Sequence, residues 1–242
     1  MTAAPTRASV HRLPQPKDPM NGLTLVFDLD GTLVDTAPDL VAATNHVLAH
    51  LGLPGVPEHS LRPWIGHGAR YMVEHAMGAP AKSLSQEERD KLLERFLEYY
   101  SRNIAVGSRP FEGAVAALQS FKRQGARLAV CTNKAEAMSR RLLQELGLDG
   151  YFAAIAGRDT FATFKPHPDH LLGTIKLAGG EPERAVMIGD SRVDIATARA
   201  AGVPIVAVSF GYSEVPIRDL DPDAVIDNYE ELAPILQKIL RC

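Results

Sequence analysis

Carboxylates gather in two short segments of this 242-residue chain, and a threonine and a lysine lie in two segments between them. The first segment reads Asp28-Leu29-Asp30-Gly31-Thr32, and the last reads Gly189-Asp190-Ser191-Arg192-Val193-Asp194. Between them lie Thr132-Asn133 and Lys165-Pro166. Clustered carboxylates repel one another and raise each other's pKa unless a cation lies among them. Oxygen ligands favour Mg²⁺ over zinc, and a cation with a lysine and a threonine suits a phosphate oxyanion.

The spacing of the first two aspartates allows them different roles. Asp28 and Asp30 are separated by one residue at a point where the chain leaves a predicted strand, so both can lie near one site. Asp28 can face phosphorus as a nucleophile, and Asp30 can face the leaving group as an acid and later water as a base. Gly31 permits the tight turn that this arrangement needs.

Three of the polar groups directly follow short apolar runs that are typical of buried strands, at Leu23–Phe27, Arg127–Cys131 and Ala185–Ile188. Lys165 can join them from the loop after a further predicted strand. The other predicted strands are Phe152–Ala156, Pro204–Val208 and Asp223–Ile226. In an open parallel sheet, sites form at the carboxyl ends of the strands. We therefore expect the separate polar groups to meet at one edge of a sheet.

Helical patterns alternate with these strands, for example over Gly113–Gln124 and Ala135–Leu146. Alternating strands and helices predict an α/β fold: a Rossmann-like parallel sheet with helices on both faces. Within that sheet we interpret Cys131 as a buried strand residue and not as a nucleophile, because no histidine follows nearby to activate it.

Residues 37–106 break this alternation and have only helical patterns. Helices are predicted over Pro38–Leu51 and Ala69–Met77, and a third begins at Ser85, where Glu88 completes a capping box. A helical insert between the first strand and the rest of the sheet is expected to form a small cap domain.

The predicted organisation has three parts. Residues 1–22 contain four prolines and form a disordered extension, residues 23–36 and 107–242 form the α/β core, and residues 37–106 form the helical cap.

Composition limits the partners and the compartment. The 26 basic and 29 acidic residues give a net charge of -3, which argues against a nucleic-acid-binding protein. No apolar run approaches the ~20 residues of a membrane span. The 2 cysteines, Cys131 and Cys242, do not form a disulfide framework and indicate a reducing compartment. We expect a cytoplasmic monomer or small homo-oligomer whose partner is a small phosphorylated metabolite, with no nucleic-acid or membrane partner.

The ordered set of motifs resembles the haloacid dehalogenase superfamily of aspartate-nucleophile phosphatases, over residues 23 to 232. The resemblance implies that Asp28 attacks phosphorus to form an aspartyl-phosphate and that Asp30 is the general acid and base. It implies phosphate binding by Thr132, Asn133 and Lys165. The dehalogenases of the superfamily lack the second aspartate, so Asp30 favours phosphate chemistry.

The same resemblance implies a metal site and a cap. Mg²⁺ would be held by Asp28, the backbone carbonyl of Asp30, and Asp190, with Asp194 as a support on the metal side. The helical insert is similar to the small helical cap of the superfamily.

Within the superfamily, several segments are similar to the phosphoglycolate phosphatase family, namely 27–40, 62–70, 108–111 and 208–212. This similarity implies hydrolysis of 2-phosphoglycolate to glycolate and phosphate. Gly66, His67 and Arg70 lie at a glycine-flanked helix start that can receive a carboxylate. One departure is Phe164, where many members carry a polar or basic residue before the lysine.

Alternatives remain at two levels. The same machinery can act on a sugar phosphate, a nucleotide or pyrophosphate, or as a mutase, and a non-catalytic phospho-aspartate switch also uses an aspartate, a threonine and a lysine. Locally, Thr132 can be the N-cap of the next helix, Asp194 can be a helix-surface charge, and His67 and Arg70 can be solvated.

Overall fold

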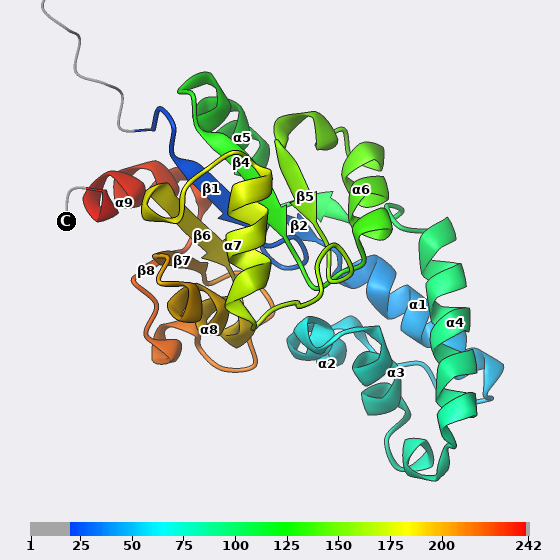
Figure 1. Cartoon of the computed structure of the whole chain (residues 1–242). Helices are drawn as coiled ribbons and strands as arrows, with labels where there is room; N and C mark the ends of the chain where they lie inside the picture. Colours follow the sequence, from blue (N-terminus) through cyan, green and yellow to red (C-terminus); the bar gives the residue numbers. More distant parts are fainter. Residues whose placement is uncertain (1–19, 241–242) are drawn as a thin grey trace, which may run out of the picture.

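The computed structural model describes residues 20–240 and contains a six-stranded parallel sheet with helices on both faces (Figure 1). The sheet order is β5-β4-β1-β6-β7-β8. The strands are β1 (Thr24–Phe27), β4 (Arg127–Cys131), β5 (Ala154–Ala156), β6 (Ala185–Gly189), β7 (Ile205–Val208) and β8 (Ala224–Ile226). Each lies within its predicted range, apart from the extension of β6 to Gly189, so the predicted α/β fold is confirmed.

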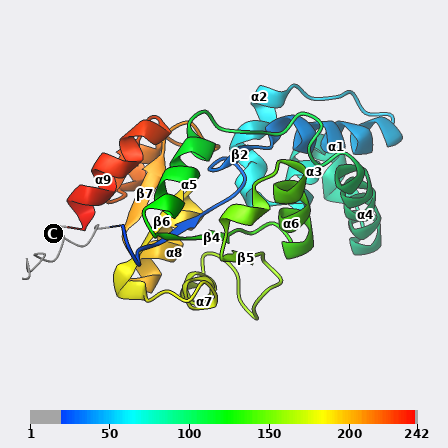
Figure 2. The same ribbon diagram turned by 90° about the horizontal axis from the view of Figure 1, so that it is seen from above.

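Successive side chains of the buried strands point to opposite faces of the sheet, so the hydrophobic core consists of two clusters, one on each face. Leu25 and Phe27 of β1 belong to the cluster on the face covered by α5 (Ala114–Arg123) and α9 (Leu232–Ile239). Val26 and Cys131 belong to the cluster on the opposite face. That face is covered by α7 (Pro168–Leu177) and α8 (Arg192–Ala201), as Figure 2 shows. Because successive side chains point to opposite faces, a strand covered on both sides must be apolar throughout.

The strand order determines where a site can form. β1 lies at the centre, with β4 and β5 on one side and β6, β7 and β8 on the other, so the winding direction reverses between β1 and β6. Phe27 pairs with Ile188 in register, and the Asp28 N–H donates to the Ile188 carbonyl at 2.9 Å. The residues that follow these two strands therefore lie side by side at the switch point, where open α/β sheets bind ligands.

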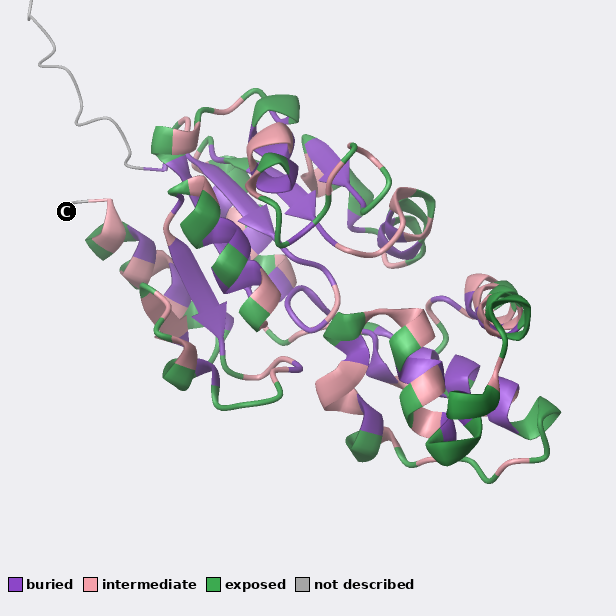
Figure 3. Ribbon diagram, turned by 60° about the horizontal axis from the view of Figure 1, so that its bottom comes forward, coloured by how far each residue is buried: buried purple, intermediate pink, exposed green. Residues whose placement is uncertain are grey.

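The helical insert lies beyond the carboxyl ends of the strands, set apart from the sheet (Figures 1 and 3). It contains α1 (Ala37–His50), α2 (Glu58–Leu61), the 3-10 helix Arg62–His67, α3 (Ala69–Met77) and α4 (Gln86–Arg102). The predicted capping box is confirmed, since Ser85 Oγ accepts from the Glu88 N–H at 3.3 Å and Glu88 Oε2 accepts from the Ser85 N–H at 2.7 Å. None of the described helices is long and apolar enough to cross a membrane.

Two linkers connect the insert to the core, and one buried carboxylate fixes them together. They form the short antiparallel pair β2 (Val34–Asp35) and β3 (Arg109–Pro110), which the sequence analysis did not predict. Asp39 in the first turn of α1 accepts from the backbone N–H groups of Gly107 and Ser108, both at 2.8 Å, and from Ser108 Oγ at 2.6 Å. The outgoing and returning chains are thus held side by side.

The boundary of the N-terminal extension differs from the prediction. Residues 1–19 of the predicted disordered segment 1–22 lie outside the described residues. Met20 is only 1% exposed and packs in the core, and its carbonyl accepts from the Leu23 N–H at 3.1 Å. The last residues of this segment are therefore part of the fold. Burial of the apolar Met20 side chain is favourable, and the proline-rich composition of the segment does not reveal it.

A buried histidine anchors the loop that carries Lys165. His170, in α7, has no exposed surface. Its Nδ1 atom accepts from the Lys165 N–H at 3.1 Å, and its Nε2 atom lies 3.0 Å from the Gly157 carbonyl oxygen. A backbone N–H can only donate and a carbonyl can only accept, so these two partners select the neutral imidazole with its proton on Nε2.

This arrangement predicts an acid-sensitive contribution to stability. Burial and the nearby charge of Lys165 lower the pKa of His170 from 6.5 to about 4. In the unfolded chain the imidazole takes up a proton below its ordinary pKa, so stability is lost as the pH falls from about 6.5 towards 4. Between pH 7 and pH 5 the loss from this group is about 2 kcal/mol.

We therefore expect His170→Gln to reduce the fall in unfolding free energy between pH 7 and pH 5, measured by urea unfolding at both pH values. The exposed His59→Gln is the matched control and should keep the wild-type dependence. Equal pH dependence in the wild type and His170→Gln would contradict the assignment of a neutral buried imidazole.

Candidate active site

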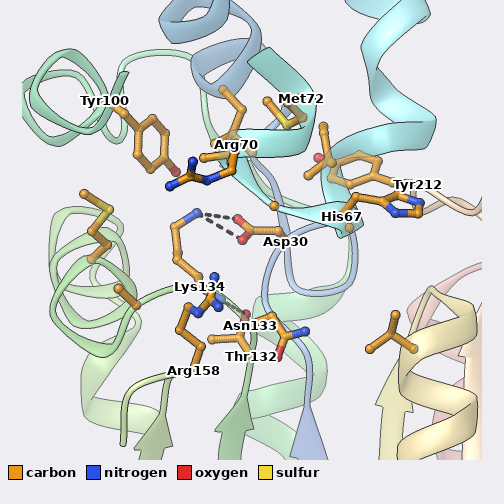
Figure 4. A pocket seen from close by; sticks show the side chains of 18 of the residues that line it. Asp30, His67, Arg70, Met72, Tyr100, Thr132, Asn133, Lys134, Arg158 and Tyr212 are labelled. Atoms are coloured by element: carbon orange, nitrogen blue, oxygen red, sulfur yellow. Dashed lines mark hydrogen bonds and ion pairs between the residues drawn. The ribbon is translucent and has the colours of Figure 1, made fainter. Parts of the chain in front are cut away.

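The polar groups that follow β1, β4 and β6 meet at one cavity of about 450 Å³ (Figure 4). Its core side is lined by Asp28, Asp30, Thr132, Asn133 and Asp190. Its other side is formed by residues of α1, α3 and α4 and the 3-10 helix before α3. The cavity thus lies between the carboxyl ends of the strands and the helical insert, as expected for a switch-point site.

Lys165 is buried at the base of this site and bridges two carboxylates. Its Nζ atom donates to Asp28 Oδ1 at 2.8 Å and to Asp194 Oδ1 at 2.6 Å, and its side chain is 3% exposed. Burial disfavours the charged amine, but the charges of Asp194 and Asp28 outweigh burial and raise the pKa of Lys165. The amine therefore stays charged and fixes the orientation of Asp28.

Asp194 is a fully buried residue, so its interpretation as a helix-surface charge is wrong. It is the third residue of α8 and forms a capping box with Ser191. Its Oδ2 atom accepts from the Ser191 N–H at 3.1 Å and from Ser191 Oγ at 2.6 Å, while its Oδ1 atom accepts from Lys165. Both of its oxygens thus bind groups of the protein, which suits a support for Lys165.

Asp190 is held from both sides. Its Oδ1 atom accepts from Thr32 Oγ1 at 3.0 Å, and its Oδ2 atom accepts from the Tyr212 N–H at 2.7 Å. The turn after β1 approaches it so closely that a Cβ atom on Gly31 would lie 2.4 Å from Asp190 Oδ2. Gly31 also has a φ of +84°, so both the turn and the close approach require glycine.

Asp28, Asp190 and Asp194 each offer a carboxylate oxygen within 4.8 Å of the others. Burial raises the pKa of Asp28 to about 6, with Lys165 opposing the change. Burial, together with the charges of Asp194 and Asp28, raises the pKa of Asp190 well above its ordinary value. Three buried carboxylates and one ammonium leave an uncompensated negative charge, so this cluster fits a divalent cation that prefers oxygen ligands.

Asp30 lines the same cavity as Asp28 and Asp190, and its partner is Lys134. Lys134 Nζ donates to Asp30 Oδ1 at 2.9 Å and to Oδ2 at 3.0 Å (Figure 4). The same amine lies 4.7 Å from the ring centroid of Tyr100, which projects from α4. Neither Lys134 nor Tyr100 is among the site residues predicted from the sequence, although Lys134 directly follows Thr132-Asn133. With Lys134 included, four carboxylates face two ammonium groups, so one divalent cation neutralises the whole site.

Thr132 and Asn133 shape the loop after β4. Thr132 Oγ1 accepts from the Lys134 N–H at 3.2 Å, and α6 begins only at Glu136, so Thr132 is not the N-cap of that helix. Asn133 Nδ2 donates to the Lys165 carbonyl at 3.0 Å. Thr132 lines the cavity, whereas the Asn133 amide joins its loop to the loop of Lys165.

The predicted cap residues Gly66, His67 and Arg70 also line this cavity. The His67 Nε2 atom contacts Glu214 of the core, and the Arg70 guanidinium donates to Asp90 Oδ1 at 2.6 Å. Both side chains are thus paired, but they stay partly open to solvent, since the His67 side chain is 39% exposed and that of Arg70 is 38% exposed.

Tyr212 links the acidic cluster to the linker of the insert. While its backbone N–H donates to Asp190, its hydroxyl donates to Asp35 Oδ1 at 2.6 Å and accepts from the N–H groups of Thr36 and Ala37 at 2.8 and 3.0 Å. The N-cap residue Thr36 makes no side-chain hydrogen bond to the start of α1. The Tyr212 hydroxyl therefore accepts from backbone N–H groups that the N-cap side chain leaves free. From the sequence, Tyr212 stands out only as part of segment 208–212, which resembles the phosphoglycolate phosphatase family.

Phe164, which departs from the family pattern, is 44% exposed, and its ring contacts the guanidinium of Arg158. The Arg158 guanidinium carbon lies 4.7 Å from the Phe164 ring centroid, and Arg158 lines the cavity from the loop after β5. The aromatic side chain thus places a charge near the site although it carries none itself.

Comparisons with known proteins show the family of the chain. Residues 25–208 match the haloacid dehalogenase-like hydrolase family. A phosphoglycolate phosphatase from Mesorhizobium japonicum is 50% identical over 218 residues, covering 90% of this chain and 96% of that protein. One from Caulobacter vibrioides is 45% identical over 210 residues, covering 87% of this chain and 89% of that protein.

Solved structures show the same fold. The crystal structure of a protein described as a predicted phosphoglycolate phosphatase from Haemophilus somnus 129PT is similar with a TM-score of 0.82 and 32% identity. The match covers 89% of this chain and 98% of that one. The family match over most of the chain, the relatives of similar length and the shared fold agree with one another. The chain therefore belongs to the haloacid dehalogenase-like hydrolase family, in which it is a phosphatase.

Proposed function

We propose that this phosphatase hydrolyses 2-phosphoglycolate to glycolate and phosphate, in a Mg²⁺-dependent reaction that passes through an aspartyl-phosphate at Asp28. The observation that carries the proposal is the buried amine of Lys165, which bridges Asp28 and Asp194 beside Asp190 at the base of the cavity. An amine in this position orients the nucleophile and binds the phosphate it attacks.

In the first step, Lys165 holds Asp28 Oδ1 and leaves Oδ2 to attack phosphorus. The Asp28 oxygen–phosphorus bond forms as the ester oxygen–phosphorus bond breaks, and Asp30 donates a proton to the departing glycolate oxygen. Thr132, whose oxygen already accepts from the Lys134 N–H, can donate its own proton to a phosphate oxygen. Mg²⁺ bound by Asp28, the Asp30 carbonyl and Asp190 would neutralise charge on the phosphate.

In the second step, Asp30 removes a proton from a water molecule that attacks the aspartyl-phosphate, which releases phosphate and restores Asp28. Lys134 positions the Asp30 side chain beside the cavity for both steps. The helical insert forms one side of the cavity, and its closure over bound substrate would exclude bulk water during the first step.

The choice of substrate has two supports. Relatives that cover nearly the same length are phosphoglycolate phosphatases. In addition, Arg70, Lys134 and Arg158 line the cavity beyond the phosphate-binding Lys165, so the cavity suits a substrate with a second anionic group.

We expect phosphate release with Mg²⁺ to show a kcat/KM for 2-phosphoglycolate about 100-fold above those for sugar phosphates, nucleotides and pyrophosphate. The panel also decides between the alternatives. A peak on another compound would overturn the substrate and keep the mechanism. A lasting aspartyl-phosphate without turnover would favour the phospho-aspartate switch, and phosphate returned to a sugar would favour a mutase.

Asp28→Asn should lower turnover by about 10³-fold or more, because the amide cannot attack phosphorus. The fold should survive, since the substitution removes one charge from a crowded acidic cluster and Lys165 keeps Asp194 as a partner. Steady-state kinetics and thermal unfolding together test this, with the exposed Asp219→Asn as the matched control. Substantial residual turnover in pure Asp28→Asn protein would refute the nucleophile assignment.

Millimolar Mg²⁺ should raise the Tm by about 4 to 8 °C at pH 7.5, because a bound cation relieves the repulsion among the buried carboxylates. The shift should shrink as the pH falls to 5.5, since the pKa of Asp28 is raised to about 6 and a protonated carboxyl binds the cation poorly. Thermal unfolding with Mg²⁺ or with EDTA measures the shift. Asp190→Asn should abolish it, and a shift that persists in this variant would place the cation elsewhere.

A further inference from the structure

We propose that Lys134 and Tyr100 form a subsite for a carboxylate that the substrate carries one carbon away from its phosphate ester. This inference rests on the proposed function and names the residues that would select its substrate. In this arrangement the phosphate lies near Lys165, and the carboxylate lies between Lys134 of the core and Tyr100 of the insert.

Lys134 has the charge and the spare donor that such a subsite needs. Its side chain is 6% exposed, and it lines the cavity from the loop after β4. An ammonium carries three donor hydrogens, and the two oxygens of Asp30 engage two of them. One donor is left for a ligand. Because the amine is desolvated, a hydrogen bond from it to a carboxylate is stronger here than in water.

Tyr100 supplies an independent sign of a missing ligand. It is 1% exposed, and its hydroxyl has no hydrogen-bond partner among the described residues. Burying a hydroxyl without a partner is costly, so such groups normally meet a ligand or water. Figure 4 shows this hydroxyl pointing into the cavity, towards the side chains of Arg70 and Lys134. It is therefore aimed at the space where the proposed carboxylate would lie.

The position of Tyr100 explains why the helical insert is needed for selection. Tyr100 belongs to α4, and its ring stacks on that of Phe96 in the same helix at a centroid distance of 5.9 Å. Lys134, in contrast, belongs to the core. The 4.7 Å contact between the Lys134 amine and the Tyr100 ring joins the two parts of the molecule. The subsite is complete only when the insert lies over the sheet as it does here.

A purely structural role for Lys134, holding Asp30 in place, makes a different prediction. Losing that role would lower the rate for every phosphomonoester by a similar factor. Losing a carboxylate contact lowers the rate only for substrates that carry the carboxylate. The ratio of kcat/KM for 2-phosphoglycolate to that for ethyl phosphate, which lacks the carboxylate, therefore separates the two roles.

The experiment measures this ratio with Mg²⁺ for the wild type, Lys134→Met and Tyr100→Phe. We expect Lys134→Met to lower the ratio by about 10- to 100-fold, since it removes a hydrogen bond to a charged group. Tyr100→Phe should lower it by about 3- to 10-fold with the Tm unchanged, because the hydroxyl has no partner in the protein to lose. If Lys134→Met fails to fold, Tyr100→Phe alone decides.

Matched controls carry the same chemical changes outside the cavity. Lys91→Met alters an exposed lysine of α4, and Tyr99→Phe alters the neighbouring tyrosine, whose ring stacks on His46. Both should keep the wild-type ratio. A wild-type ratio in Tyr100→Phe and Lys134→Met would overturn the subsite and leave the proposed function intact. A wild type that does not prefer 2-phosphoglycolate over ethyl phosphate would overturn the proposed substrate, and the subsite with it.

Discussion

The burial of one ammonium group among three carboxylates governs the architecture of this phosphatase. Lys165 is 3% exposed and pairs with Asp28 and Asp194, so neither its own charge nor theirs is well solvated. Such a group is tolerable only if every partner is held in place. The His170 imidazole and the Asn133 amide anchor the Lys165 backbone, and the capping box of α8 holds Asp194.

The order of the strands in the sheet brings the carboxylates of this cluster together. The reversal between β1 and β6 makes these strands neighbours, so Asp28 lies beside Asp190 although the two residues are far apart in the sequence. Tyr212 then carries this arrangement outward, since its backbone binds Asp190 while its hydroxyl binds the first turn of α1. Tyr212 therefore contacts both the acidic cluster and the start of the helical insert, which links the position of the insert to the site beside it.

Two groups of charged residues meet at the cavity. In the first, Lys165 and the cluster of Asp28, Asp190 and Asp194 suit a cation and a phosphate. In the second, Lys134 balances Asp30 and contacts Tyr100 of the insert, whose hydroxyl has no hydrogen-bond partner among the described residues. A small molecule with two anionic groups matches this arrangement, whereas a molecule with one leaves buried polar groups without partners, which is the physical basis of strong discrimination.

The sequence by itself determined the six strands of the main sheet, the capping box at Ser85 and the carboxylate motifs, because apolar runs and cap residues act locally. It also indicated that Asp28, Thr132 and Asp190 would meet, since the ends of parallel strands share an edge. Only the tertiary structure decided the pairing of Lys134 with Asp30 and Tyr100, the complete burial of Asp194 and the two links of Tyr212. These contacts join elements far apart in the chain, and they depend on how helices pack over the sheet, which no local pattern encodes.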